Sequence, residues 1–144
     1  MDEILVKVRL DDQLDERFIP TKAHESDAGF DIKSPFDFVV PAHGCSAFNT
    51  LVGMLIPDGY VGMLKSKSGL NVKHGIRSEG VVDAGYTGNI VVKLYNDSDK
   101  DYQVQVGDKV TQLVVMPIPR VRTEVVKDFE DTERGDGGFG STGR

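Results

Sequence analysis

The stretch Ile4-Leu-Val-Lys-Val-Arg-Leu10 decides the class of fold. Every second residue from Ile4 onward is apolar, and in an extended chain these side chains share one face, which is typical of a half-buried strand. Residues 36–40 repeat this alternation just before a turn at residues 41–44. Further β-rich runs predict strands at residues 47–56, 60–64, 89–96, 102–106, 109–116 and 121–129. The chain is therefore predicted to consist mainly of short strands.

Turn signals rich in Gly, Pro, Asn and Asp separate these runs, at residues 57–59, 83–85, 96–98, 107–108 and 117–119. Many short strands at even spacing predict an all-β, jelly-roll-like barrel or sandwich and disfavour an α/β fold. Residues Ser68–His74 favour one short helix, with Ser68 available near its N-terminus. We expect a β-barrel domain over residues 1–131 and a flexible glycine-rich tail over residues 132–144.

Composition narrows the class of protein. A length of 144 residues fits one domain that can bury a core without disulfides. Cys45 is the only cysteine, which excludes an intrachain disulfide and a multi-cysteine metal site and suits a reducing cytoplasm. The net charge of −6 disfavours nucleic-acid binding, and neither a signal-peptide pattern nor a membrane-length apolar run is present. We expect a cytoplasmic protein without nucleic-acid or membrane partners.

The tail carries the residues that a lid over a nucleoside phosphate needs. Its five glycines allow backbone N–H groups to face an anion. Arg134, Ser141 and Thr142 would add a cation and two hydroxyl donors, and Phe139 offers a flat face for a base. A terminus without order is the alternative that composition alone favours. The tripeptide Arg134-Gly-Asp136 matches an adhesion signal only by chance in a chain without a secretion signal.

Two turns hold further candidate residues. Lys65-Ser-Lys-Ser-Gly-Leu70 could cradle phosphates through its lysines, the Ser68 hydroxyl and backbone N–H groups, although a solvated turn has the same composition. Gly80–Asn89 joins apolar residues through a tight turn that contains Asp83. A carboxylate fixed beside a triphosphate can orient and deprotonate water for in-line attack, whereas an aspartate that caps its own turn is the alternative.

Two isolated polar residues and the histidines complete the candidates. Asp31 could hold a nearby cation and Gln112 could donate an amide hydrogen to phosphate, although such residues more often lie at surfaces or in turns. The three histidines share no metal-ligand spacing, and no nucleophile–histidine arrangement follows from residue order.

Five short motifs occur together and in order along the chain. They are Asp27-Ala-Gly-Phe-Asp31, Ser68-Gly-Leu70, Gly80-Val-Val-Asp-Ala-Gly-Tyr86, Gly107-Asp-Lys-Val-Thr-Gln112 and Arg134-Gly-Asp-Gly-Gly-Phe-Gly-Ser-Thr-Gly143. Together they resemble the ordered motifs of the trimeric dUTP pyrophosphatases. The match spans residues 27 to 143, and the glycine-rich tail is its most specific part. The resemblance implies hydrolysis of dUTP to dUMP and pyrophosphate, which limits uracil in DNA and supplies dUMP for dTMP synthesis.

The resemblance also implies roles for the residues of the third motif. Asp83 would be the general base that activates water for attack on the α-phosphorus. Tyr86 would pack against the deoxyribose and leave no room for a 2′-hydroxyl. The backbone of Gly80, Val81 and Val82 would read uracil and reject the thymine methyl group.

The other motifs would hold the triphosphate. Lys67, Ser68, Gly69 and Gln112 would bind phosphates, and Asp31 would support the phosphate–metal region. In the tail, Phe139 would stack on uracil, while the clamp on the triphosphate would come from Arg134, Gly140, Ser141 and Thr142. The resemblance further implies that Mg²⁺ is held by phosphates and waters without a direct protein ligand. It implies a homotrimer with active sites shared between subunits, and it leaves a regulatory protein partner open.

Two positions depart from the family pattern, and two other functions compete with it. Lys67 stands where the family commonly has Arg, so a bidentate fork is lost. Arg77 stands where many relatives place an Asn near the uracil, which puts side-chain recognition of the base in doubt. A dCTP deaminase would need a Glu where Lys93 stands. A non-catalytic jelly-roll interaction or capsid-type protein would explain the strands but not Asp83 or the tail.

Overall fold

The structure is a computed structural model that describes residues 3–138 and residue 140, and these residues form a mainly β fold with one short α-helix. The strands are β1 (Lys7–Leu10), β2 (Gly29–Lys33), β3 (Phe38–Val40), β4 (Cys45–Asn49), β5 (Val52–Leu55), β6 (Tyr60–Lys65), β7 (Ile76–Val82), β8 (Val91–Asn96), β9 (Tyr102–Val104) and β10 (Lys109–Pro117). The helices are the 3₁₀ turn η1 (Glu16–Phe18) and α1 (Ser68–His74).

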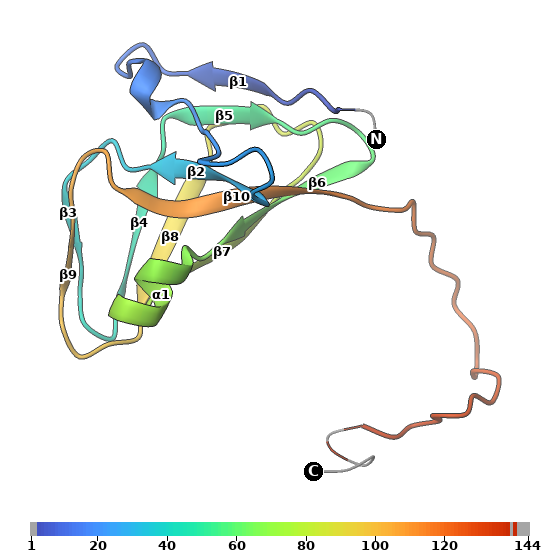
Figure 1. The fold of residues 1–144 in the computed structure, drawn as a ribbon. Coiled ribbons are helices and arrows are strands. Elements are labelled where there is room, and N and C mark those ends of the chain that lie inside the picture. Colours follow the sequence, from blue (N-terminus) through green and yellow to red (C-terminus); the bar gives the residue numbers. More distant parts are fainter. Residues whose placement is uncertain (1–2, 139, 141–144) are drawn as a thin grey trace.

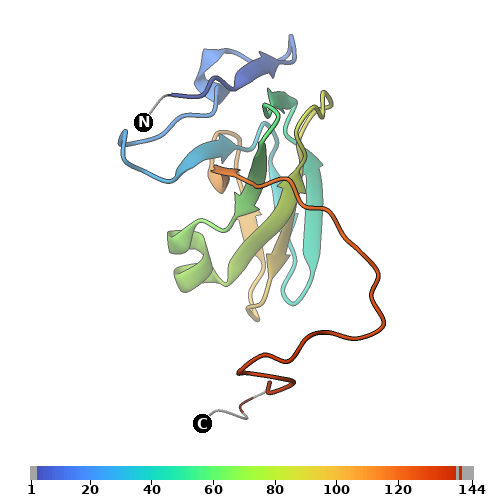
Figure 2. The ribbon, with the colours of Figure 1, turned by 90° about the vertical axis from the view of Figure 1, so that its right-hand side faces the viewer.

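Six strands form one antiparallel sheet in the order β2-β10-β6-β7-β8-β4. The sheet is curled (Figures 1 and 2). β1 pairs with β5, and β3 pairs with β9. β7 joins the two halves of the large sheet, because its first residues pair with β8 and its last residues pair with β6. The predicted all-β, jelly-roll-like fold is confirmed.

The core lies inside the curl of the sheet. Alternate residues of β8 are buried, and both Val92 and Leu94 are fully enclosed. Other strands add fully buried side chains, namely Ile32, Val40, Val52, Ile76, Val104 and Leu113. Each such side chain contributes about 1.5–3 kcal/mol of burial free energy relative to an exposed one. This core makes the barrel a rigid frame for the loops that connect its strands.

The structure changes the bounds of several predicted strands. The first strand is shorter than predicted, since only Lys7–Leu10 pairs with β5. The predicted run at residues 47–56 divides into β4 and β5 because Leu51 has a left-handed φ of 61°. β2 and β7 were not predicted, since polar or small residues such as Asp31 and Ser78 occupy buried positions in them and interrupt the apolar alternation.

The predicted strand at residues 121–129 was wrong. These residues have no regular structure and are exposed, and Val125 is 99% exposed. A strand needs a partner for its backbone N–H and C=O groups, and within this chain the segment has none among the described residues. The chain leaves the barrel after β10 and extends away from it (Figure 1).

The predicted helix at Ser68–His74 is confirmed as α1. Its N-cap is Lys67, which makes no side-chain capping bond, so Ser68 is the first helical residue and not the cap. Gly75 ends the helix with a left-handed φ of 68°, which glycine adopts without a steric cost. No helix in the described part of the chain is long and apolar enough to cross a membrane.

Candidate active site

Asp31 is the centre of a charged cluster between β2 and β10. Its carboxylate is buried, with the residue only 6% exposed, and it accepts a hydrogen bond from the Lys67 ammonium group. Lys109 Nζ lies 3.5 Å from the other carboxylate oxygen. A buried carboxylate is costly unless it is paired, so Asp31 holds these two lysines in place. The structure therefore brings the predicted residues Asp31 and Lys67 together and adds Lys109, which was not predicted.

Gln112 lies beside this cluster. It faces Asp31 across the β2–β10 pair, and its side-chain N–H donates to the Ser66 carbonyl oxygen at 3.0 Å. A Cβ atom at Gly29 would approach the Gln112 Cβ to 3.0 Å, so a glycine is needed there for the amide to lie across β2. The amide is thus fixed next to the loop of residues 65–68.

A buried hydroxyl network fastens this loop to the sheet. Ser66 Oγ accepts a hydrogen bond from Ser78 N at 3.0 Å, and the Thr111 hydroxyl donates to the Lys65 carbonyl oxygen at 2.9 Å. Ser78 Oγ and Thr111 Oγ1 lie 2.5 Å apart and link the two contacts. Sequence reasoning missed Ser66, Ser78 and Thr111, and their only signal is that hydroxyl residues stand at inward positions of strands. The network pre-positions Lys67 and Ser68.

Thr111→Val tests the network, because valine keeps the shape but has no hydroxyl. We expect the free energy of unfolding to fall by about 1–3 kcal/mol, since the Lys65 carbonyl and the Ser78 hydroxyl lose their partner. Chemical denaturation measures this loss. The matched control is Thr123→Val on the exposed segment after β10, which should change stability by less than about 0.5 kcal/mol. Equal effects of the two substitutions would contradict a role for the Thr111 hydroxyl.

Asp83 lies in the turn between β7 and β8. The Gly85 N–H donates to the Ile56 carbonyl oxygen at 3.1 Å, and Gly85 has a left-handed φ of 83°. The Tyr86 N–H donates to the backbone oxygen of Asp83 at 3.2 Å, so the tight turn is made by backbone contacts. Among the described residues no hydrogen bond reaches the Asp83 carboxylate, which is exposed. The carboxylate is not used to cap its own turn and can accept a proton.

A pocket of about 360 Å³ lies next to Asp83, within the usual range for small-ligand sites of about 300–1,000 Å³. β7 pairs with β6 through Glu79–Val82 but with β8 only through Ile76–Ser78. The two strands therefore diverge towards the turn, and one backbone edge of Gly80–Val82 lacks a strand partner. The residues that line the pocket include Gly80, Val81, Val82, Asp83 and Tyr86, all predicted as site residues, together with Asn89.

The Tyr86 ring is held in a defined position at this pocket. Its hydroxyl donates to the Asn89 carbonyl oxygen at 2.8 Å. A Cβ atom at Gly88 would overlap the Tyr86 ring, so a glycine is required there. Tyr86 remains half exposed and presents a flat surface to a ligand.

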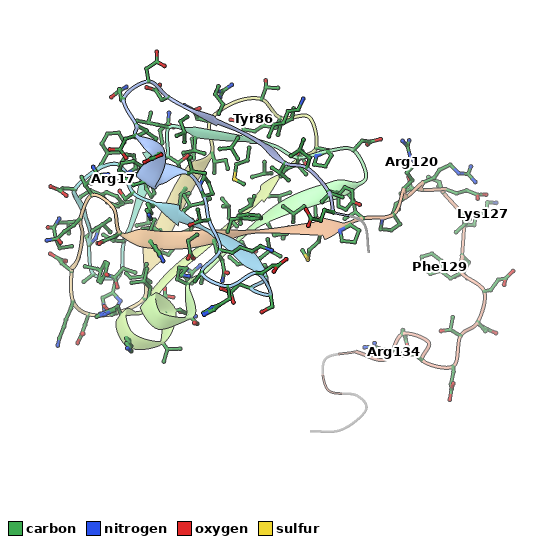
Figure 3. All side chains as sticks on the ribbon, turned by 45° about the horizontal axis from the view of Figure 1, so that its top comes forward. Arg17, Tyr86, Arg120, Lys127, Phe129 and Arg134 are labelled. Carbon is green, nitrogen blue, oxygen red and sulfur yellow. The ribbon has the colours of Figure 1, made fainter. Side chains whose placement is uncertain are left out.

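The described part of the tail lies apart from both groups. Arg134 donates from Nε to the Gly137 carbonyl oxygen at 2.6 Å, which closes a local turn. Figure 3 shows Arg134 on the extended segment, far from Tyr86 on the barrel. Gly140 has a left-handed φ of 84°. Phe139, Ser141 and Thr142 lie outside the described residues.

The charged cluster and the pocket lie at opposite ends of the β6–β7 pair. Val82, which precedes Asp83, pairs with Gly62, whereas Lys65, just before the loop, pairs with Glu79. The three residues from Gly62 to Lys65 span about 10 Å along an extended strand, and the chain continues to Lys67 beyond that. One chain thus holds three separate groups of candidate residues: the charged cluster, the pocket and the tail.

Arg77 does not lie at the pocket. It stands near the start of β7, six residues before Asp83, and its Nε donates to Asp97 Oδ2 at 2.7 Å. This hydrogen bond raises the pKa of the guanidinium group, which also lies 4.4 Å from the centre of the Tyr95 ring. Asp97 and Tyr95 thus engage the Arg77 side chain away from this pocket, and the absence of a family Asn at this position stays a departure from the family pattern.

In the part of the chain that the structure describes, no three His, Cys, Asp or Glu residues are grouped so that they could hold a metal ion. The charged cluster instead combines lysines, an amide and a single carboxylate. Ammonium and amide groups donate hydrogen bonds and suit phosphate oxygens.

Three comparisons with known proteins agree on one family. A family model described as dUTPase matches residues 15–143. Over 127 residues, the chain is 43% identical to the deoxyuridine 5′-triphosphate nucleotidohydrolase of Candida glabrata, covering 87% of this chain and 88% of that protein.

Solved structures agree. The dUTPase of Staphylococcus bacteriophage 80alpha with dUpNHpp superposes with a TM-score of 0.86 at 31% identity, over 97% of this chain and 99% of that chain. A variant dUTPase from phage phi11 of S. aureus, which has a structural Mg(II) ion, gives a TM-score of 0.77 at 31% identity, over 89% and 100%.

Proposed function

The chain belongs to the dUTPase family, and we propose that it hydrolyses dUTP to dUMP and pyrophosphate by attack of water on the α-phosphorus. The observation that carries this proposal is the pocket beside β7, where an unengaged carboxylate, an unpaired backbone edge and a fixed aromatic ring lie together. The reaction would limit uracil in DNA and supply dUMP for dTMP synthesis.

Asp83 acts as the general base. Its carboxylate accepts a proton from a water molecule, whose oxygen attacks the α-phosphorus in line with the bond to the β-phosphate oxygen. That bond breaks, pyrophosphate leaves, and the water oxygen remains in dUMP. The backbone contacts of Gly85 and Tyr86 support this role, because they hold the turn without using the carboxylate.

Selectivity for the nucleoside comes from the same pocket. The unpaired edge of Gly80–Val82 offers backbone donors and acceptors that can pair with uracil. Because this backbone edge would lie close to the bound base, it leaves no room for a thymine methyl group. Tyr86 packs on the deoxyribose. Because its hydroxyl is bonded to Asn89, the ring cannot easily turn away from a 2′-hydroxyl.

The triphosphate binds at the charged cluster. Lys67 and the Gln112 amide contact phosphate oxygens, with the exposed residues Ser68 and Gly69 beside them. Lysine ammonium groups cannot ligate a metal, and the one carboxylate, Asp31, is paired with them, so the donor set fits a Mg²⁺ ion that is held by phosphates and waters, with Asp31 supporting that region. Bound Mg²⁺ would neutralise charge on the phosphate oxygens.

We infer that the complete site forms between subunits of a homotrimer. The tail supports this inference, because it lies away from the candidate residues on its own barrel (Figures 1 and 3). The tail, which extends away from its own barrel, would close over a site on a neighbour. There Arg134, Gly140, Ser141 and Thr142 contact the triphosphate and Phe139 stacks on uracil. The exposed single cysteine, Cys45, favours the cytoplasm as the compartment.

Mixing two inactive variants tests the shared site. In refolded equal mixtures of Asp83→Asn and Lys67→Met chains, we expect about a quarter of the native activity. Each shared site takes Asp83 from one subunit and Lys67 from another, and after random assembly both residues are intact in about a quarter of the sites. Each variant alone should stay inactive, and refolded native chains serve as the control. A mixture as inactive as its components would contradict the shared site.

A substrate panel tests the reaction itself. Pyrophosphate release in the presence of Mg²⁺ should be fast with dUTP and slow with UTP, dTTP and dCTP, because the pocket selects both base and sugar. Ammonia release from dCTP would instead favour a deaminase. Failure to release pyrophosphate from dUTP would overturn the proposed function.

A further inference from the structure

The N-terminal strand β1 reaches the turn that carries Tyr86. Arg9 Nη1 donates to the Thr87 carbonyl oxygen at 2.8 Å, and Arg9 Nη2 donates to Asn89 Oδ1 at 3.0 Å. Arg9 precedes residue 15, where the match to the family model begins, and it lies in none of the five motifs. It is therefore a contact of this chain that the family resemblance does not explain.

The fold makes room for this contact at Gly53. Arg9 on β1 pairs with Gly53 on β5, so the guanidinium group must pass over β5 to reach the turn. A Cβ atom at Gly53 would come within 2.8 Å of Arg9 Nη2. The planar guanidinium fork can bond two acceptors at once, which a single ammonium group does less well.

Among the described residues, Arg9 is the only one outside the turn of residues 83–89 that hydrogen-bonds to residues 86–89. The Tyr86 N–H and O–H both donate within the turn, to Asp83 and Asn89. The flanking residues are attached separately, since the Gly85 and Ile90 N–H groups donate to the Ile56 and Val52 carbonyl oxygens. Between these two anchors, the position of the turn depends on Arg9.

The space around the contact would allow the turn to move. A cavity of about 180 Å³ lies between β1, β5 and the turn, and Arg9, Gly53, Tyr86 and Thr87 are among its lining residues. Without the guanidinium group this space would be larger, and among the residues that the structure describes no other side chain hydrogen-bonds to Thr87. The two residues that Arg9 contacts follow Tyr86 in the sequence, and the Tyr86 hydroxyl donates to one of them, Asn89.

We propose that Arg9 is a positioning residue for the nucleoside pocket, which fixes Tyr86 through Thr87 and Asn89 and so sets the selection of deoxyribose over ribose. The role rests on the proposed function, since Tyr86 is taken to pack on the sugar. It gives the N-terminal strand a part in substrate selection, beyond its pairing with β5.

Arg9→Met and Lys7→Met form a matched pair of variants for this role. Both remove a cation from β1, but among the described residues Lys7 makes no hydrogen bond to the turn. For Arg9→Met we expect kcat/KM for dUTP to fall about tenfold, because a displaced Tyr86 ring would leave the nucleoside poorly positioned for the reaction. The fall in kcat/KM for UTP should be smaller, so the ratio of kcat/KM for dUTP to kcat/KM for UTP should decrease. Lys7→Met should match the native protein in both.

Hydrogen exchange separates positioning from a general loss of stability. In Arg9→Met, the Tyr86 amide, which donates within the turn to the Asp83 oxygen, should exchange about tenfold faster relative to the core amide of Val92. Arg9→Lys should restore part of the protection and of the substrate ratio. An unchanged ratio together with unchanged exchange would overturn the role of Arg9. If the native chain does not cleave dUTP, the proposed function fails, while the exchange measurement alone still decides whether Arg9 holds the turn.

Discussion

Replacing Asp83 with Asn is expected to lower kcat for dUTP by about 10³-fold, within the range of about 10²–10⁴ for loss of a general base. The amide has the same shape as the carboxylate but cannot accept the proton of the attacking water. No other described residue bonds to this carboxylate, and the side chain is exposed, so the fold should be unaffected. Nucleotide binding should persist because the backbone edge and Tyr86 are unchanged. Steady-state kinetics and calorimetric titration with dUMP measure the two properties.

Asp99→Asn is the matched control for this substitution. Asp99 is also an exposed aspartate in a turn, but it lies beyond the opposite end of β8 from Asp83. It should retain native kcat and native stability. An Asp83→Asn protein that kept more than about a tenth of native kcat would contradict the assignment of the base, since general-base catalysis is worth at least about 10²-fold.

Removing residues 139–144 is expected to lower kcat by about 10²-fold or more, the effect of losing one or more donors to the developing negative charge. The deletion takes away the Phe139 ring and the Ser141 and Thr142 hydroxyls. The free energy of unfolding should change by less than about 0.5 kcal/mol, because the deletion lies far beyond β10 and residues 118–136 are already exposed. Kinetics and chemical denaturation of the same preparation compare the two effects.

A second variant separates the length of the tail from its chemistry. Replacing residues 139–144 with six residues of alternating Gly and Ser restores the length but not the aromatic ring or the native order of donors. It should resemble the deletion more than the native protein. Full activity in the deleted protein would show that the tail is not a lid.

The fold could be predicted from the sequence wherever the inward side of a strand is apolar. β6, β10 and α1 have nearly the predicted bounds, because alternation or helix signals end at clear turn residues. β2 and β7 were not predicted, because the polar residues Asp31 and Ser78 are buried in them. These two residues can be buried because their hydrogen-bond partners lie far away in the sequence. Residues 121–129 have the apolar spacing of a strand, but a strand also needs a neighbour to pair with.

The candidate site could be predicted only in its parts. The third motif correctly grouped Gly80–Val82 with Asp83 and Tyr86, because a turn brings sequence neighbours together. Arg9, Lys109 and Thr111 lie on strands and make contacts with residues far away in the sequence, and no local pattern distinguishes them from ordinary strand residues. The distance between the charged cluster and the pocket also depends on strand register, which single motifs do not contain.

Hydrolysis of dUTP in water enriched in ¹⁸O, with Mg²⁺ present, tests most directly whether water attacks the α-phosphorus. Mass spectrometry of the products should find one ¹⁸O atom in dUMP and none in pyrophosphate. Label in pyrophosphate would place the attack on the β-phosphorus, and the absence of both products would show that the chain does not carry out this reaction.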